Sequence, residues 1–147
     1  MKAIIISLVM LVFFISCASH NVQLYEKIDN SNKTVTVPPG SSGLTGKLKK
    51  ALSEDGWKLA VYRGPSVAEG ELGEKTKLQQ YDTFNTRYRL IVSFSQFDLC
   101  FNFSPAIRYD ISFIDNQSGT EAFTMDGRDC ESDVVEKFKD ILRGIDD

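Results

Sequence analysis

The sequence lacks the residue types and the charge clusters that several classes of function require. Its 147 residues include a single His, which excludes a metal site built from several histidines. Its 17 Lys and Arg residues are nearly balanced by 20 Asp and Glu residues, so the formal net charge is −3. A nucleic-acid-binding protein would normally carry a clustered basic surface, and we therefore expect no nucleic-acid partner. The length suits one domain, and 42% hydrophobic with 25% charged residues is typical of a folded one.

The apolar run at the N-terminus is too short to cross a bilayer, which takes about 20 apolar residues in a helix. It covers residues 3–15, is interrupted only by Ser7, and follows the single basic residue Lys2. This pattern is typical of a cleaved secretory signal. A buried N-terminal helix is the alternative, and the lack of any polar face disfavours it.

The end of this run carries the most specific motif of the chain. Residues 14–17, Phe-Ile-Ser-Cys, resemble the lipobox of bacterial lipoproteins, although Phe14 departs from the usual Leu. The resemblance implies cleavage after Ser16, a diacylglycerol on the Cys17 sulfur and acylation of the new amine. Two or three acyl chains hold a protein stably on a membrane, whereas one chain gives only marginal binding. A plain secreted protein with Cys17 near an ordinary cleavage site is the alternative.

The residues after Cys17 bear on which membrane would hold the protein. In such lipoproteins an Asp after the acylated Cys favours retention at the inner membrane, and here Ala18 and Ser19 follow instead. The resemblance therefore implies a periplasm-facing protein at the outer membrane, with the inner membrane as the alternative. In size and style the chain is similar to small lipobox lipoproteins of the enterobacterial type, but only the signal and Cys17 carry a specific motif.

Cys100 and Cys130 remain as an even pair in an oxidising compartment, and we expect a disulfide between them. The bridge would close a loop of about 31 residues and contribute about 3–4 kcal/mol in the chain-entropy model. Two free thiols are the alternative. Zinc is disfavoured because these cysteines and His20 do not make four ligands.

The chain divides into three predicted parts. Residues 1–16 are the expected lipoprotein signal peptide, residues 17–33 the lipidated Cys with a polar tether, and residues 34–147 a single domain facing the periplasm. The tether is expected because residues 18–33 are polar and have no sustained periodicity. It would carry His20, where a catalytic role is not expected.

The pattern of the domain predicts an α+β fold. Amphipathic helices are expected near residues 44–52 and from Glu131 onward, and residues 64–80, with three Gly and one Pro, are expected to form a mobile loop. Expected strands cover residues 34–37, 57–61, 83–94, 107–113 and 121–125. We therefore predict an antiparallel sheet of about four to five strands with two amphipathic helices packed on one face.

Four aromatic residues between the expected strands change phase along the chain: Phe94, Phe97, Phe101 and Phe103. Because side chains alternate with period two in a strand, the change predicts a bulge or break near residues 95–96. We expect these rings in the core, and an exposed partner-binding face is the alternative.

The remaining motifs do not indicate a catalytic, cofactor or metal site. The glycine-rich residues 40–47 have the wrong spacing for a phosphate-binding loop, and Leu48 stands where that loop needs a hydroxyl. A catalytic triad would have to use the only His, and no two carboxylates are singled out for glycoside cleavage. We expect the acidic residues at 126, 129, 131 and 133 to form a turn and a helix N-terminus, without an EF-hand calcium pattern.

These observations together favour a non-enzymatic domain that acts through protein contacts in the bacterial envelope. An envelope sensor and a cell-wall synthesis complex are the candidate partners, and no nucleotide or other cofactor is expected. The alternative is a binding module for peptidoglycan or for a small envelope ligand.

Overall fold

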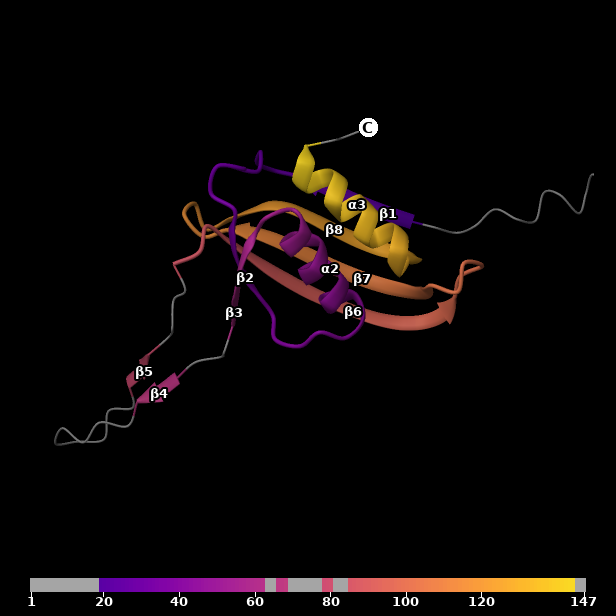
Figure 1. Cartoon of the computed structure of the whole chain (residues 1–147), viewed down its shortest axis with the longest axis horizontal. Helices are drawn as coiled ribbons and strands as arrows, with labels where there is room; N and C mark the ends of the chain where they lie inside the picture. The colour runs from indigo at the N-terminus through magenta and orange to yellow at the C-terminus, as the bar shows by residue number, and fades with distance from the viewer. Residues whose placement is uncertain (1–18, 63–65, 69–77, 81–84, 145–147) are drawn as a thin grey trace, which may run out of the picture.

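The main sheet has six strands in the order β1-β8-β7-β6-β2-β3, and two helices accompany it (Figure 1). The computed structural model describes residues 19–62, 66–68, 78–80 and 85–144. The strands of this sheet are β1 (Ser19–Leu24), β2 (Thr34–Val37), β3 (Lys58–Val61), β6 (Tyr88–Leu99), β7 (Pro105–Asp115) and β8 (Thr120–Cys130). The helices are α2 (Gly43–Glu54) and α3 (Glu131–Arg143).

The expected signal peptide and Cys17 lie outside the described residues. Among the described helices, none is long and apolar enough to cross a membrane.

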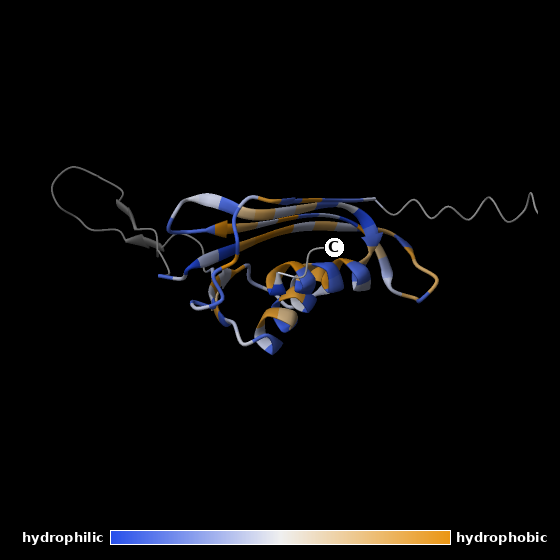
Figure 2. Ribbon diagram, turned by 90° about the horizontal axis from the view of Figure 1, so that it is seen from above, coloured by the Kyte–Doolittle hydropathy of each residue, from blue (hydrophilic) through white to orange (hydrophobic). Residues whose placement is uncertain are grey.

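Both described helices lie on one face of the sheet, and no helix of the described residues covers the other face (Figure 2). The core forms between the two layers, where Phe113 of β7 is the centre of an aromatic cluster. Its ring centroid lies 5.0 Å from that of Tyr88, 5.2 Å from that of Phe123 and 6.3 Å from that of Phe138. All four rings are buried, so this cluster joins three strands to α3.

The helices form where the apolar spacing predicts them. In α2 the buried side chains are Leu44, Leu48, Ala51 and Leu52, which recur every three to four residues on one face. The helix ends before Gly56, whose φ of +83° favours glycine. In the same way α3 ends at Gly144, which has a left-handed conformation.

The sheet is mixed, and the prediction of an antiparallel sheet is only roughly met. β6, β7 and β8 pair antiparallel, and β1 pairs antiparallel with β8. β2 pairs parallel with both β3 and β6. Parallel pairing of β2 and β3 follows from the intervening α2, because two parallel strands need a crossover connection.

The first strand is a correction to the predicted tether. Residues 18–33 are polar, yet Ser19–Leu24 pairs residue by residue with β8, and Ile28 is buried in the core. The tether interpretation is therefore wrong for these segments. The only sequence pattern that indicates this strand is the weak alternation of Val22 and Leu24, which lie opposite the buried Met125 and Phe123.

The change of phase in the aromatic residues corresponds to one irregular strand. The β6–β7 register shifts between Gln96 and Asp98, and Phe97 is the extra residue, close to the predicted position. The predicted loop over 64–80 lies mostly outside the described residues. Within it, β4 (Ser66–Ala68) and β5 (Leu78–Gln80) form a separate antiparallel pair.

Candidate interaction site on strand β6

Exposed apolar side chains are concentrated on β6 and on the loop that follows it. Nine large hydrophobic residues are exposed in the described part of the chain, and six of them belong to this segment: Ile91, Phe94, Phe97, Leu99, Phe101 and Phe103. The expectation that the four phenylalanines form core is therefore wrong. Every residue of β6 from Ser93 to Leu99 is exposed, so the second half of the strand adds no buried side chain to the core.

One edge of β6 is open over most of its length. β2 pairs only with Tyr88 and Arg89, at the start of the strand. From Leu90 to Leu99, β6 pairs with β7 on one side and with no described strand on the other. Ten residues of strand extend over about 33 Å. Asp98 is the only charged residue among them, so the edge has little of the charge that normally keeps open edges apart.

Two contacts hold aromatic rings of this segment in place. Phe94 packs against the start of α2, where a Cβ at Gly43 would lie 2.7 Å from the ring. This close approach explains why residue 43 is a glycine. On β7, the guanidinium of Arg108 lies 5.9 Å from the ring centroid of Phe97, a cation–π contact.

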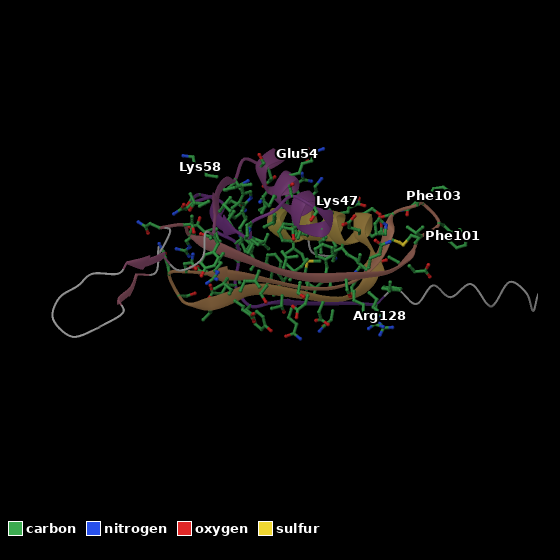
Figure 3. The ribbon with its side chains drawn as sticks, turned by 90° about the horizontal axis from the view of Figure 1, so that it is seen from below. Lys47, Glu54, Lys58, Phe101, Phe103 and Arg128 are labelled. Atoms are coloured by element: carbon green, nitrogen blue, oxygen red, sulfur yellow. A yellow bond between two sulfur atoms is a disulfide. The ribbon has the colours of Figure 1, made fainter. Side chains whose placement is uncertain are left out.

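The loop between β6 and β7, residues 100–104, is closed by its own hydrogen bonds. The Cys100 N–H donates to the Ser104 carbonyl at 2.8 Å, and the Phe103 N–H donates to the Cys100 carbonyl at 2.9 Å. The Ser104 N–H donates to the Asn102 side chain at 3.0 Å. Phe101 is 98% and Phe103 87% exposed, and both point away from the domain (Figure 3).

This loop is also attached to the start of α3. A disulfide joins Cys100 to Cys130, with 6.0 Å between their Cα atoms, which is compatible with the expected bridge. Asn102 donates to the Ser132 hydroxyl at 3.2 Å, and the Ser132 N–H donates to the Ser104 hydroxyl at 3.1 Å. The exposed rings therefore stand on a backbone that is held from two sides.

His20 lies in β1, and its two ring nitrogens contact side chains of other strands. Nδ1 lies 2.8 Å from the Tyr109 hydroxyl and Nε2 2.5 Å from an Asp129 carboxylate oxygen. Gly127 lies between β1 and β7 in this row, and without a side chain it leaves room for the imidazole to reach Tyr109.

This arrangement ties β1 to the sheet. Burial raises the pKa of Tyr109 to about 12, and the negative charges of Asp129 and Asp126 add to the shift. At neutral pH the hydroxyl therefore stays protonated, which makes it a poor nucleophile.

The acidic residues near the start of α3 are bound individually by neighbouring groups. Glu131 is buried and pairs with Lys47 of α2, and Asp126 accepts a hydrogen bond from Asn21. Asp129, Cys130 and Asp133 have ligand-type atoms within 4.8 Å of one another. The Cys130 sulfur is part of the disulfide, so it is no metal-binding thiolate.

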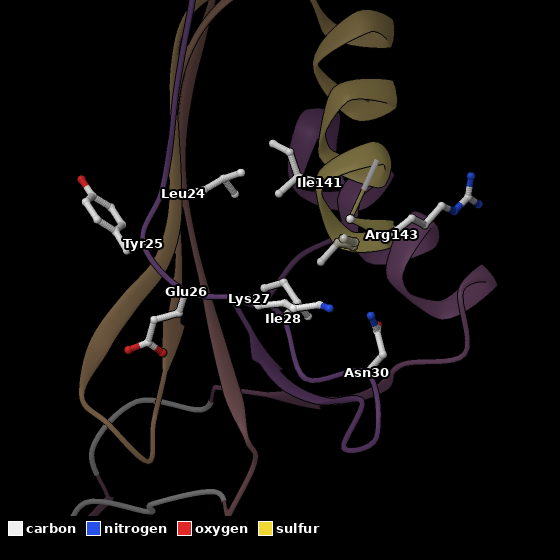
Figure 4. Close-up of a pocket in the computed structure, with 10 residues that line it drawn as sticks. Leu24, Tyr25, Glu26, Lys27, Ile28, Asn30, Ile141 and Arg143 are labelled. Carbon is white, nitrogen blue, oxygen red and sulfur yellow. The ribbon is translucent and has the colours of Figure 1, made fainter. Parts of the chain in front are cut away.

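A cleft of about 490 Å³ lies at the opposite end of the sheet, beside the end of α3. Leu24, Ile28 and Ile141 point toward one another in it, while Tyr25 and Arg143 point outward (Figure 4). It is a mixed apolar and polar depression. No sequence pattern predicts this cleft, because its walls come from segments more than one hundred residues apart.

Comparisons with known proteins identify a fold. No family model matches the chain, and no curated protein does. Among solved structures, a dodecamer of a variant of PelC from Paraburkholderia phytofirmans is similar with a TM-score of 0.51 and 10% sequence identity. The match covers 87% of this chain and 96% of that one. A second PelC dodecamer from the same organism matches with a TM-score of 0.46 and 11% identity, over 86% and 94% of the two chains.

Proposed function

We infer that this protein is a lipid-anchored protein of the bacterial cell envelope that acts without catalysis, through protein contacts along the open edge of β6. The observation that carries the proposal is this edge, which extends from Leu90 to Leu99 and displays apolar side chains with a single charge. A partner strand can add to such an edge through main-chain hydrogen bonds, and pockets for alternate side chains then give specificity.

The chemistry of the edge suits a protein partner. Ile91 and Phe97 are exposed beside it, and Ser93 and Ser95 lie between them with exposed side chains that can donate and accept hydrogen bonds. The bulge at Phe97 sets the end of the pairing region, since an added strand would have to follow the same irregularity.

A second copy of this chain is the first partner to test. The PelC structure that is similar with a TM-score of 0.51 is a dodecamer. Self-association through β6 would cover the open edge and the apolar side chains beside it at the same time. An envelope sensor and a cell-wall synthesis complex remain the other candidate partners.

Photo-crosslinking in intact envelopes tests the proposal. A photoreactive amino acid at Ser93, on β6, should give a protein adduct, because the edge would be covered by the partner. The matched control places it at Gln117, an exposed residue in the turn at the far end of the sheet, where no adduct is expected. Equal adducts at both positions, or none at Ser93, would contradict the β6 interface.

The anchor is tested separately. Radiolabelled palmitate should label the wild-type chain and not Cys17→Ala, because Cys17 is the acceptor that the lipobox implies. Equal labelling of both proteins would remove the anchor from the proposal and leave the β6 interface standing.

The alternative is a binding module for peptidoglycan or for a small envelope ligand, and the cleft beside α3 favours it. Its volume of about 490 Å³ is within the range of small-molecule sites, about 300–1,000 Å³. Recovery of muropeptides with a photoreactive group at Asn30, which lines the cleft, would support this alternative.

A further inference from the structure

The loop after β6 lies within a stretch of the chain without charges. Residues 99–107 read Leu-Cys-Phe-Asn-Phe-Ser-Pro-Ala-Ile, and the nearest charged residues are Asp98 and Arg108. The two most exposed large hydrophobic side chains of the described structure, Phe101 and Phe103, lie in this stretch. Burying it in an apolar medium would therefore remove much hydrophobic surface from water without removing a charge.

The backbone of the loop is partly hydrogen-bonded within itself. Three of its five N–H groups donate within the loop, which reduces the number of unsatisfied backbone groups that an apolar medium would penalise. Phe103 has a φ of +61°, which residues other than glycine rarely adopt. The disulfide and the contacts with Ser132 hold this conformation, so exposure of the rings is built into the fold.

The start of β1 lies close to this loop in space. Ser19 pairs with Arg128, two residues before Cys130, and Cys130 is bridged to Cys100 at the base of the loop. From strand spacing and rise, Ser19 lies within about 20 Å of the loop. Cys17 precedes Ser19 by two residues, which span about 7 Å at most. The start of β1 and the loop thus lie at the same end of the sheet (Figure 1).

We propose that the loop of residues 100–104 docks on a lipid bilayer, with Phe101 and Phe103 inserted at the level of the head groups and upper acyl chains, as a second contact beside the lipid on Cys17. The proposal rests on the lipid anchor proposed above. An anchor two residues from β1 brings the end of the sheet with the loop to the membrane surface.

The shape of the loop favours lipid over a protein groove as its occupant. Phe101 and Phe103 stand on a convex tip with Asn102 between them, and they point away from the domain in different directions (Figure 3). A protein partner would need two separate pockets for these rings. Lipid chains adapt to a convex apolar tip, and aromatic side chains at the interface are typical of membrane-docking segments.

Charges of both signs lie near the loop, since Asp98 and Asp129 adjoin it, but the pairs of charges that face each other on β7 and β8 differ in sign along the strands. On the helix-free face Arg108 lies directly opposite Arg128, and like charges in this position are unfavourable. Neither Arg forms an ion pair with a described residue. The next pair along the strands, Asp110 opposite Asp126, lies farther from the loop. The positive pair is therefore the one nearer to the phosphates of a bilayer that contacts the loop.

Tryptophan fluorescence of the full-length acylated chain in vesicles tests the proposal. Phe101→Trp would be reconstituted into vesicles of phosphatidylethanolamine and phosphatidylglycerol, with or without bromine on the acyl chains. We expect a blue shift of the new emission and a loss of about half of it in brominated lipid, because bromine quenches a ring that reaches the acyl region. Trp57, the only native Trp, is buried in the core and gives the unquenched reference.

Gln117→Trp, in the turn at the far end of the sheet, is the matched control and should keep its emission in both vesicles. Vesicle-bound Phe101→Trp without quenching would overturn the proposal while leaving the anchor intact. A blue shift without quenching would also overturn it and would indicate that a second copy of the chain covers the loop. If the chain does not bind vesicles at all, the docking proposal is overturned. Palmitate labelling of Cys17 then shows whether the anchor proposal fails with it.

Discussion

Removal of the disulfide should lower the free energy of unfolding by about 4 kcal/mol. Cys100 and Cys130 are 30 positions apart, and the loop that the bridge closes restricts the unfolded chain by this amount in the chain-entropy model. The perturbation is the double substitution Cys100→Ala/Cys130→Ala in residues 18–147. Alanine keeps the Cβ atom at both positions and adds no larger side chain.

Equilibrium unfolding in urea, followed by the fluorescence of Trp57, measures the effect. Trp57 is buried and packs edge-to-face on Tyr88 and Phe113, so its emission reports on the main core. With a urea slope of about 2 kcal/mol per molar for a domain of this size, the midpoint should fall by about 2 M. The wild-type protein in a strong reductant is the control and should unfold at the same midpoint as the double variant.

A decrease of the urea midpoint by less than about 0.5 M would contradict this prediction. It would mean that the unfolded chain is not appreciably restricted by the bridge, or that the loop contacts with Ser132 hold the hairpin to α3 without it. Hydrogen exchange at the Ser104 and Ser132 amides would distinguish these explanations, because retained protection in the variant indicates the second.

Three further predictions concern individual contacts. The pKa of Tyr109 is about 12 in the folded chain and 10.0 ordinarily, so the unfolded chain loses this proton first as pH rises. The free energy of unfolding should therefore fall by about 2–3 kcal/mol between pH 10 and 12. Urea titrations of Tyr109→Phe should lack this part of the loss. Gly127→Ala places a Cβ 1.9 Å from the Ser19 carbonyl oxygen, so it should lower the free energy of unfolding by about 2 kcal/mol or more and expose β1 to proteases. Gly119→Ala, the control, has open space around the new Cβ; it should cost about 1 kcal/mol and leave β1 protected. Lys47→Met leaves the buried Glu131 carboxylate without its cation and should cost about 3 kcal/mol in urea unfolding.

Each of these three has an outcome that would contradict it. An unchanged pH dependence in Tyr109→Phe would mean that the hydroxyl titrates normally. Equal protease sensitivity of β1 in the two glycine variants would remove the steric argument. For the ion pair, Lys47→Met/Glu131→Gln should recover part of the loss, and no recovery would show that Lys47 acts through its packing instead.

The elements that depend on local pattern were predictable from the sequence. Both helices follow from apolar spacing at three to four residues, and each ends at or just before a glycine with positive φ, Gly144 and Gly56 respectively. The bulge follows from the change of phase between Phe94 and Phe97, because a strand with one face toward a core cannot change phase without an extra residue.

The elements that depend on tertiary contacts were not predictable in the same way. β1 contains Ser, His, Asn and Gln, and its strand conformation depends on pairing with β8 and on the contacts of His20. The open edge of β6 was missed because strand length is not encoded in any short window: β2 has four residues and β6 has twelve. Phe101 and Phe103 look like core residues by composition, and only the hairpin geometry exposes them.

The pairing of β1 with β8 also determines how the domain responds to force. A pull on the chain before Ser19 acts along the axis of β1, while the hydrogen bonds of the antiparallel ladder are perpendicular to that axis. All six residue pairs of this ladder are then loaded together in shear, rather than opened one at a time as in unzipping. If the domain is held at its N-terminal end, as the proposed anchor would hold it, this ladder is expected to resist a pull along β1 more than a ladder opened pair by pair.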